Sequence, residues 1–98
     1  MNEQLRTIST LDRVIHEPGR LMIVALLAGV KECDFQFLLT ETKLNKGNLS
    51  SHLSKLEAAG YVEIVKTYRG KVPMTLLRLT PDGLKSFEGY RKQLLSAF

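Results

Sequence analysis

The feature that most constrains the fold is a change in the spacing of apolar residues, from helical to alternating and back. Up to Gly60, apolar residues recur every three or four positions, as on an amphipathic helix. Over 61–68 (YVEIVKTY) and 74–80 (MTLLRLT) they alternate, as in strands joined by a basic turn. Helical spacing returns after Thr80, a helix N-cap followed by Pro81. The sequence therefore predicts a mainly α fold with a small β-hairpin (α+β).

Four helices are predicted before the hairpin, over residues 2–16, 20–28, 34–43 and 46–59. Pro18 separates the first two, and the second ends at Gly29. The run LMIVALLAGV makes this second helix apolar nearly all round, so it should be buried. Asp34 and Asn45 are N-cap residues for the third and fourth helices, and Gly60 ends the fourth.

Length and composition indicate one globular domain over residues 1–98. An apolar share of 44% fits a soluble protein, and no apolar run approaches the ~18 residues of a membrane span. The N-terminus MNEQLRTIST lacks the layout of a signal peptide, so we expect a cytoplasmic protein with no membrane partner. Cys33 is the single cysteine, which excludes an internal disulfide and a cysteine-based zinc site.

The positive charge is concentrated in one segment of the chain. Between Lys43 and Arg78 there are seven basic and two acidic residues, a net charge of +5. The rest of the chain carries seven basic and eight acidic residues, a net charge of −1. Such a segment is typical of a surface that binds a polyanion.

The fourth predicted helix has an unusual polar face. At 100° per residue, Leu49, Leu53 and Leu56 fall within one narrow arc and form its core side. Solvated helix faces usually carry Glu, Lys and Arg. Here the outer side and its flank are small and polar: Gly47, Asn48, Ser51, His52, Ser54 and Lys55. Small polar side chains allow a helix to enter the major groove and bond base edges, which favours a recognition helix over a merely solvated one.

The ordered motifs GNLSSHL, LEAAGYV, KTYRGKVPMT and LTPDG resemble those of small winged-helix transcription factors related to the MarR family. The resemblance implies a winged helix-turn-helix that binds double-stranded DNA as a homodimer. It places the helix-turn-helix at 34–59 and the wing at 61–80. The recognition-helix contacts it implies are Lys46, Asn48, Ser50, Ser51, His52 and Lys55, with Ser50 nearer the edge. Its wing contacts are Lys66, Arg69 and Lys71.

The terminal segments 2–16 and 81–98 carry long apolar stripes. They either close over a single domain or form a dimer interface, and their length favours the dimer. The residues assigned to dimerisation are Leu5, Ile8, Leu11, Ile15, Phe87, Leu94, Leu95 and Phe98. A dimer with two recognition helices predicts a pseudo-palindromic operator.

Other functions have weaker support in the sequence. His52 and His16 have no second ligand at metal spacing, and Cys33 is more typical of a packed small residue than of a redox sensor. No residues suggest catalysis, so we expect no enzyme activity, metal or cofactor. A winged-helix protein-interaction module and a non-specific DNA binder stay open as alternatives. The operator sequence, repression or activation, and any small-molecule effector are not specified.

Overall fold

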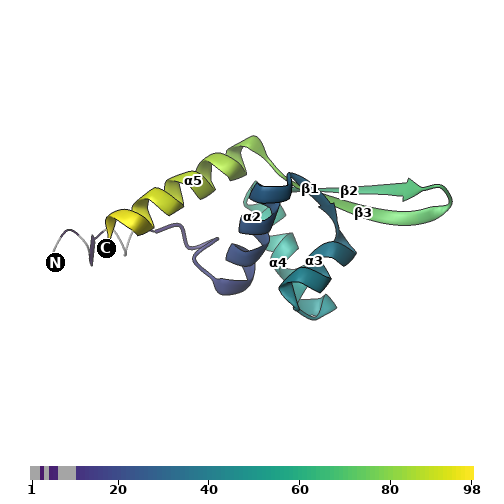
Figure 1. Cartoon of the computed structure of the whole chain (residues 1–98), viewed down its shortest axis with the longest axis horizontal. Helices are drawn as coiled ribbons and strands as arrows, with labels where there is room; N and C mark the ends of the chain where they lie inside the picture. The colour runs from purple at the N-terminus through teal and green to yellow at the C-terminus, as the bar shows by residue number, and fades with distance from the viewer. Residues whose placement is uncertain (1–2, 4, 7–10) are drawn as a thin grey trace.

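In the computed structural model, residues 3, 5, 6 and 11–98 are described. The elements are α2 (Pro18–Val30), β1 (Glu32–Asp34), α3 (Phe35–Thr42), α4 (Lys46–Ala58), β2 (Val62–Arg69), β3 (Val72–Leu79) and α5 (Pro81–Ser96). Helices α2, α3 and α4 form the centre, the β2–β3 hairpin projects from one side, and α5 extends to the other (Figure 1). The predicted fold class, a mainly α winged helix-turn-helix with a β-hairpin, is confirmed.

Local capping signals set the starts of three helices as predicted. Asp34, Asn45 and Thr80 each accept a backbone N–H from three residues further on, at 2.7, 2.8 and 2.8 Å. These bonds satisfy donors that a helix N-terminus leaves unpaired. The predicted starts of α3, α4 and α5 are therefore confirmed, and their ends differ from prediction by one or two residues.

Helix α2 is longer and less enclosed than the sequence predicted. Glu17 caps it: its two carboxylate oxygens accept the N–H groups of Gly19 and Arg20 at 3.0 and 2.8 Å. The helix passes through Gly29 and ends at Val30, where Lys31 adopts a positive φ of 71°. Gly19, Ile23, Val24 and Leu27 are buried on one side of the helix. Met22 and Val30 are exposed, so the prediction that the helix is buried nearly all round was wrong.

The sheet has a third strand that the sequence analysis missed. Its order is β1-β3-β2 and both pairs are antiparallel. Strand β1 has three residues, with Cys33 opposite Leu77 at its centre. Three residues are too few to show alternation, and the strand exists because β3 offers it an edge. It pairs with 76–78, so no strand among the described residues flanks β3 on that side over 72–75.

Residues 11–17 are turns, not the end of a helix over 2–16 as predicted, although Glu3, Leu5 and Arg6 are helical. Asp12 accepts the N–H of Val14 at 2.9 Å and the hydroxyl proton of Tyr61. These bonds hold the segment in turns. The four-residue spacing of Leu11 and Ile15 suggested a helix, but both are buried in the core, 5% and 0% exposed.

The core lies between α2, α3, α4, the segment 11–17 and the half of the sheet nearest the helices. Its largest fully buried side chains are Ile15, Ile23, Val24, Leu27, Leu38, Leu49, Leu56 and Leu77. Helix α5 contributes buried Tyr90, with Phe87 and Leu94 half-buried against this core. Leu95 and Phe98, near its end, are 70% and 88% exposed. Within the described part of the chain, the apolar side chains at the end of α5 are therefore largely exposed.

Candidate nucleic-acid interface

Helix α4 presents a polar face on a buried apolar one. Leu49, Leu53 and Leu56 are buried, and they pack α4 against α2 and β2. The exposed positions include five of the six predicted recognition residues, Lys46, Asn48, Ser50, Ser51 and Lys55. The leucine side anchors the helix, and the rest is open to a ligand.

The turn between α3 and α4 fixes how α4 is presented. Thr42 donates its hydroxyl proton to the carbonyl of Leu38 at 2.7 Å, within the last turn of α3. Lys43 follows in the left-handed region (φ 58°), and Asn45 then caps α4. At the other end Gly60 has φ 81°, which lets the chain turn from α4 into β2. The two helices and this short turn form the helix-turn-helix.

His52, the sixth predicted recognition residue, is half-buried and faces α2. Its Nδ1 lies 3.4 Å from Nη1 of Arg20 and 3.6 Å from Oε2 of Glu17. A Cβ at Gly19 would come within 2.6 Å of the His52 Nε2, so the ring lies directly against that glycine. The contact with DNA predicted for His52 is untested, but the ring is engaged with the start of α2.

The same contacts shift the acidity of Glu17. Burial alone would raise the pKa of its carboxyl group. The N–H groups of Arg20 and Gly19, with the charges of His52 and Arg20, outweigh burial and lower the pKa below its usual value. Glu17 is therefore ionised at neutral pH, as its role at the start of α2 requires.

The wing is the outer half of the β2–β3 hairpin. Gly70 begins its two-residue turn with φ 63°, the conformation that a tight II′ turn requires of its first residue. Arg69 and Lys71 flank this glycine and are exposed, and Tyr68 is 70% exposed. Lys66 lies closer to the body and donates to the Thr75 hydroxyl at 3.1 Å. Two predicted wing cations are thus at the tip, and one is held along the strands.

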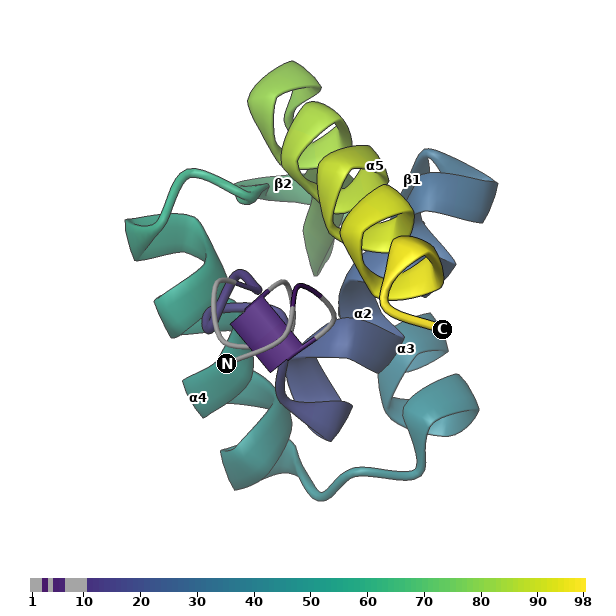
Figure 2. The same ribbon diagram turned by 90° about the vertical axis from the view of Figure 1, so that its left-hand side faces the viewer.

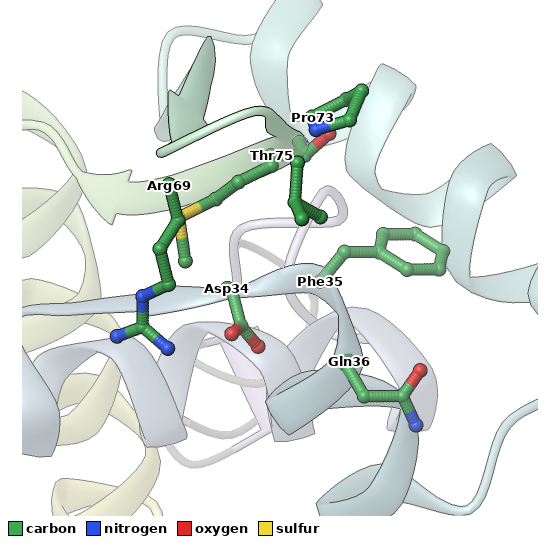
Figure 3. Close-up of a pocket in the computed structure, with 8 residues that line it drawn as sticks. Asp34, Phe35, Gln36, Arg69, Pro73 and Thr75 are labelled. Carbon is green, nitrogen blue, oxygen red and sulfur yellow. The ribbon is translucent and has the colours of Figure 1, made fainter.

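A pocket of about 390 Å³ lies where the wing leaves the body. Its lining comes from the junction of β1 and α3 and from the outer part of the hairpin: Asp34, Phe35, Gln36, Arg69, Val72, Pro73, Met74 and Thr75. Figure 3 shows the guanidinium of Arg69 and the carboxylate of Asp34 on the same side of this pocket. The wing and the helix-turn-helix therefore share one concave surface. Among the described residues, the side chain of Arg69 has no hydrogen bond or ion pair.

The base of the hairpin is tied to α5 by a compact set of bonds. Thr80 donates its hydroxyl proton to the carbonyl of Gly60 at 2.6 Å, and its backbone N–H bonds the carbonyl of Tyr61 at 2.9 Å. Gly83 lies so close to the backbone just before β2 that an added Cβ would be 2.3 Å from the carbonyl oxygen of Tyr61. The LTPDG motif thus joins the wing to α5.

Cys33 lies on β1, within this sheet. Burial, together with the charges of Asp34 and Glu32, raises the pKa of its thiol to about 11. The thiol is therefore protonated at neutral pH, and a protonated thiol is a poor nucleophile. The part of the chain that the structure describes holds no group of three or more His, Cys, Asp or Glu side chains placed to bind a metal ion.

The predicted dimerisation residues fall into different environments. Ile8 lies outside the described residues, and Leu5 is exposed. Leu11 and Ile15 are in the core of the chain itself, which accounts for their apolar character without a partner. Phe87 and Leu94 are half-buried, whereas Leu95 and Phe98 are exposed. Over residues 3, 5, 6 and 11–98, no helix has the length and apolarity to cross a membrane.

A helix-turn-helix with a small polar recognition face, followed by a hairpin with a basic tip, defines the class of winged-helix DNA-binding proteins. A model of the winged helix DNA-binding domain family matches residues 20–97, so the chain belongs to this family. The chain is also 36% identical over 84 residues to the uncharacterized protein MJ0432 of Methanocaldococcus jannaschii. That alignment covers 85% of this chain and 90% of the relative.

Solved structures of transcriptional regulators share the fold. The transcriptional regulator homologue protein from Pyrococcus horikoshii OT3 matches with a TM-score of 0.88 and 26% identity, over 97% of this chain and 93% of that one. NadR in complex with 4-hydroxyphenylacetate matches with a TM-score of 0.67 and 27% identity, over 96% of this chain and 65% of NadR. The present chain thus spans just under two thirds of NadR.

A MarR-family regulator from Silicibacter pomeroyi gives a TM-score of 0.68 over 96% of this chain and 62% of that one. At 15% identity, this likeness shows the fold alone. The resemblance to winged-helix regulators is confirmed by the family model, and the solved regulators, including the one of the MarR family, share the fold.

Proposed function

We propose that this protein is a transcriptional regulator that binds double-stranded DNA as a homodimer at a pseudo-palindromic operator. The observation that carries the proposal is the composition of α4: a buried leucine side beneath an exposed face of small polar and basic residues. Such a face can approach base edges closely, and it contains donors and acceptors for them. The family and the structural relatives support the same function.

The proposed contacts divide by chemistry. Asn48 and Ser51 are exposed on α4, and we assign them to base readout. The amide of an asparagine can bond the edge of adenine, and a serine hydroxyl can bond either a donor or an acceptor on a base edge. Lys46, Lys55, Arg69 and Lys71 are exposed cations that bind phosphates. Ser50 and Lys66 are at the margins of this surface. His52 faces α2, so we give it no part in base readout.

The dimer is proposed from the exposed apolar end of α5. Leu84, Leu95 and Phe98 are exposed large apolar side chains on this helix and its end. They extend the half-buried positions Phe87 and Leu94. An apolar surface of this kind is typical of a protein interface. A twofold axis along α5 would place one recognition helix on each half-site of an operator.

The test is selection of bound sequences from a random duplex pool, with the mass of the protein measured in solution at the same concentration. We expect an enriched inverted repeat and the mass of a dimer. The half-sites should be spaced by ~10 base pairs or a multiple. Variants Leu95→Ser and Phe98→Ser should give monomers that still fold, since both side chains are exposed.

The remaining outcomes separate the alternatives. Salt-dependent binding without an enriched sequence would identify a non-specific DNA binder. Absence of binding at low salt would contradict the proposal and favour a protein-interaction module. A monomer that binds an enriched single half-site would contradict the proposed homodimer and would still support sequence-specific DNA binding.

A further inference from the structure

A second group of cations lies beside α4, apart from the wing. Arg13 of the segment 11–17, Arg20 of α2 and Lys55 of α4 line one hollow of about 290 Å³ together with Val14. Figure 2 shows α4 beside α2, and in Figure 1 the wing projects away from these helices. Two parts of the chain that are distant in sequence, residues 11–20 and α4, therefore bring positive charge to one place.

Arg20 is held in place by its neighbours. Its Nε donates to the backbone carbonyl of Val14, and its Nη1 lies 3.8 Å from Oε2 of Glu17 and 3.4 Å from Nδ1 of His52. The side chain is only 15% exposed. Its Nη2 has no partner among the described residues and is not buried. The guanidinium is thus fixed in orientation, with donors left over for a ligand.

The charge of this group is not neutralised within the described part of the chain. The side chains of Arg13 and Lys55 are exposed and make no ion pair or hydrogen bond to another described residue. Glu17 is the acid in contact with the group, and two backbone N–H groups of α2 already bind its carboxylate. Three cations against Glu17 and the neighbouring Asp12 leave a net charge of +1.

We propose that Arg13, Arg20 and Lys55 form a second site for DNA backbone phosphate, on the flank of the recognition helix. Lys55 is two helical turns from Asn48 and shares its side of α4, so DNA that contacts Asn48 runs alongside Lys55. The strand backbone at the edge of the groove then meets Arg13 and Arg20. This inference rests on the proposed function, because it names additional contacts for the same DNA.

In this arrangement His52 is a positioning residue. Its ring lies between Gly19 and the Glu17–Arg20 pair, and it links α4 to the start of α2. The recognition helix and the second phosphate site therefore hold a fixed relation to each other. The Cβ of any other residue at position 19 would require the ring to move.

The test compares two single-charge variants in the full chain. Arg13→Gln removes an exposed cation of the proposed site, and Lys31→Gln removes an exposed cation at the far end of α2. Binding to the selected operator and to random duplex is measured over a salt series. We expect Arg13→Gln to lower the slope of log K against log salt by about one and to weaken both complexes about fivefold at 0.15 M salt. Lys31→Gln should change neither.

The results separate this inference from the proposed function. Equal effects of Arg13→Gln and Lys31→Gln, with a wild type that binds its operator, would overturn the second site and keep the regulator. Absence of wild-type binding would contradict the regulator itself.

Ethylation of operator phosphates gives a direct map. We expect one cluster of phosphates at which ethylation blocks the wild type but has no further effect on Arg13→Gln. The cluster sensitive to Lys71→Ala, at the wing, should be a different one. A single shared cluster would also overturn the inference.

Discussion

The two ends of the β2–β3 hairpin are built from different interactions. The inner end is buried: Val62 and Leu77 are in the core, and Thr80 and Gly83 join the strands to α5. The outer end makes few contacts, and Tyr68, Arg69 and Lys71 are exposed there. The inner end therefore contributes most of the stability of the hairpin, and we propose that the outer end serves DNA binding. Substitutions at the two ends should therefore affect different measurements.

The largest expected effect is that of Gly83→Ala at the inner end. The new Cβ would be 2.3 Å from the carbonyl oxygen of Tyr61. Relief of this clash requires the backbone of α5 or of Tyr61 to move, which costs more free energy than the movement of a side chain. We expect a loss of about 3 kcal/mol or more in the free energy of unfolding, measured with urea.

Gly89→Ala is the matched control in the same helix, where nothing lies within 4 Å of the added methyl group. It should stabilise the protein by about 0.5–1 kcal/mol, because alanine is the better helix former. Similar losses for both variants would mean that the approach of α5 to the hairpin is looser than these contacts indicate.

Tyr61→Phe should have the next largest effect. The Tyr61 hydroxyl binds the carboxylate of Asp12 and so fixes the segment 11–17 to the inner end of the hairpin. Its loss leaves a half-buried carboxylate with one partner fewer, which should cost about 1–3 kcal/mol in urea unfolding. An unchanged free energy of unfolding would mean that water replaces the hydroxyl at no cost.

The same tyrosine gives a pH dependence. Burial and the hydrogen bond to Asp12 raise the pKa of Tyr61 above its ordinary value. Above about pH 10 the unfolded chain therefore releases this proton before the folded chain does, so wild-type stability falls as pH rises. Tyr61→Phe should lack this part of the decline, and equal slopes in the two proteins would contradict the assignment.

These bonds also mark the limit of what the sequence could predict. The caps of α3, α4 and α5, the turn at Gly60 and the hairpin were predictable, because each depends on residues within one turn or one strand pair. The helix predicted over 2–16 was wrong over 11–16, because Tyr61, whose side chain bonds Asp12 from 49 residues away, helps to hold the turns. Strand β1 was missed for the same reason: its partner is β3.

In the candidate site too, local features could be predicted from the sequence and long-range contacts could not. The exposed positions of α4 followed from a helical wheel, which separates the leucine side from the polar side. The wheel placed His52 on the flank but could not show that α2 lies there. Arg13 and Arg20 were passed over, because the sequence around them is nearly neutral on average. In the fold Lys55 of α4 lies beside the two arginines, so three cations outnumber the nearby acids Asp12 and Glu17.

Gly70→Ala tests the turn at the outer end. Its φ of 63° is unfavourable for a residue with a Cβ, so we expect a loss of about 1 kcal/mol by urea unfolding. Gly70→Asn should lose less, since asparagine tolerates this region better. DNA binding should weaken in both variants in proportion to the loss of the turn. A larger loss than that of Tyr61→Phe would contradict the view that the outer end adds little stability.

Lys71→Ala should leave stability nearly unchanged, within about 0.5 kcal/mol, because the side chain is exposed. Its effect belongs to binding. Removal of one phosphate contact should weaken operator and random duplex alike, about fivefold at 0.15 M salt, and lower the salt slope by about one.

Asn48→Ala on α4 is the variant to compare with Lys71→Ala, because it removes a proposed base contact and not a phosphate contact. It should reduce discrimination at one base pair by about 1–3 kcal/mol and leave the salt slope unchanged. If Lys71→Ala instead changed base preference, the wing would read sequence through the width or the edges of the minor groove. If neither variant affected binding while both folded, the polar face of α4 and the wing tip would not be the DNA-binding surface. The outer end of the hairpin would then have no role in binding.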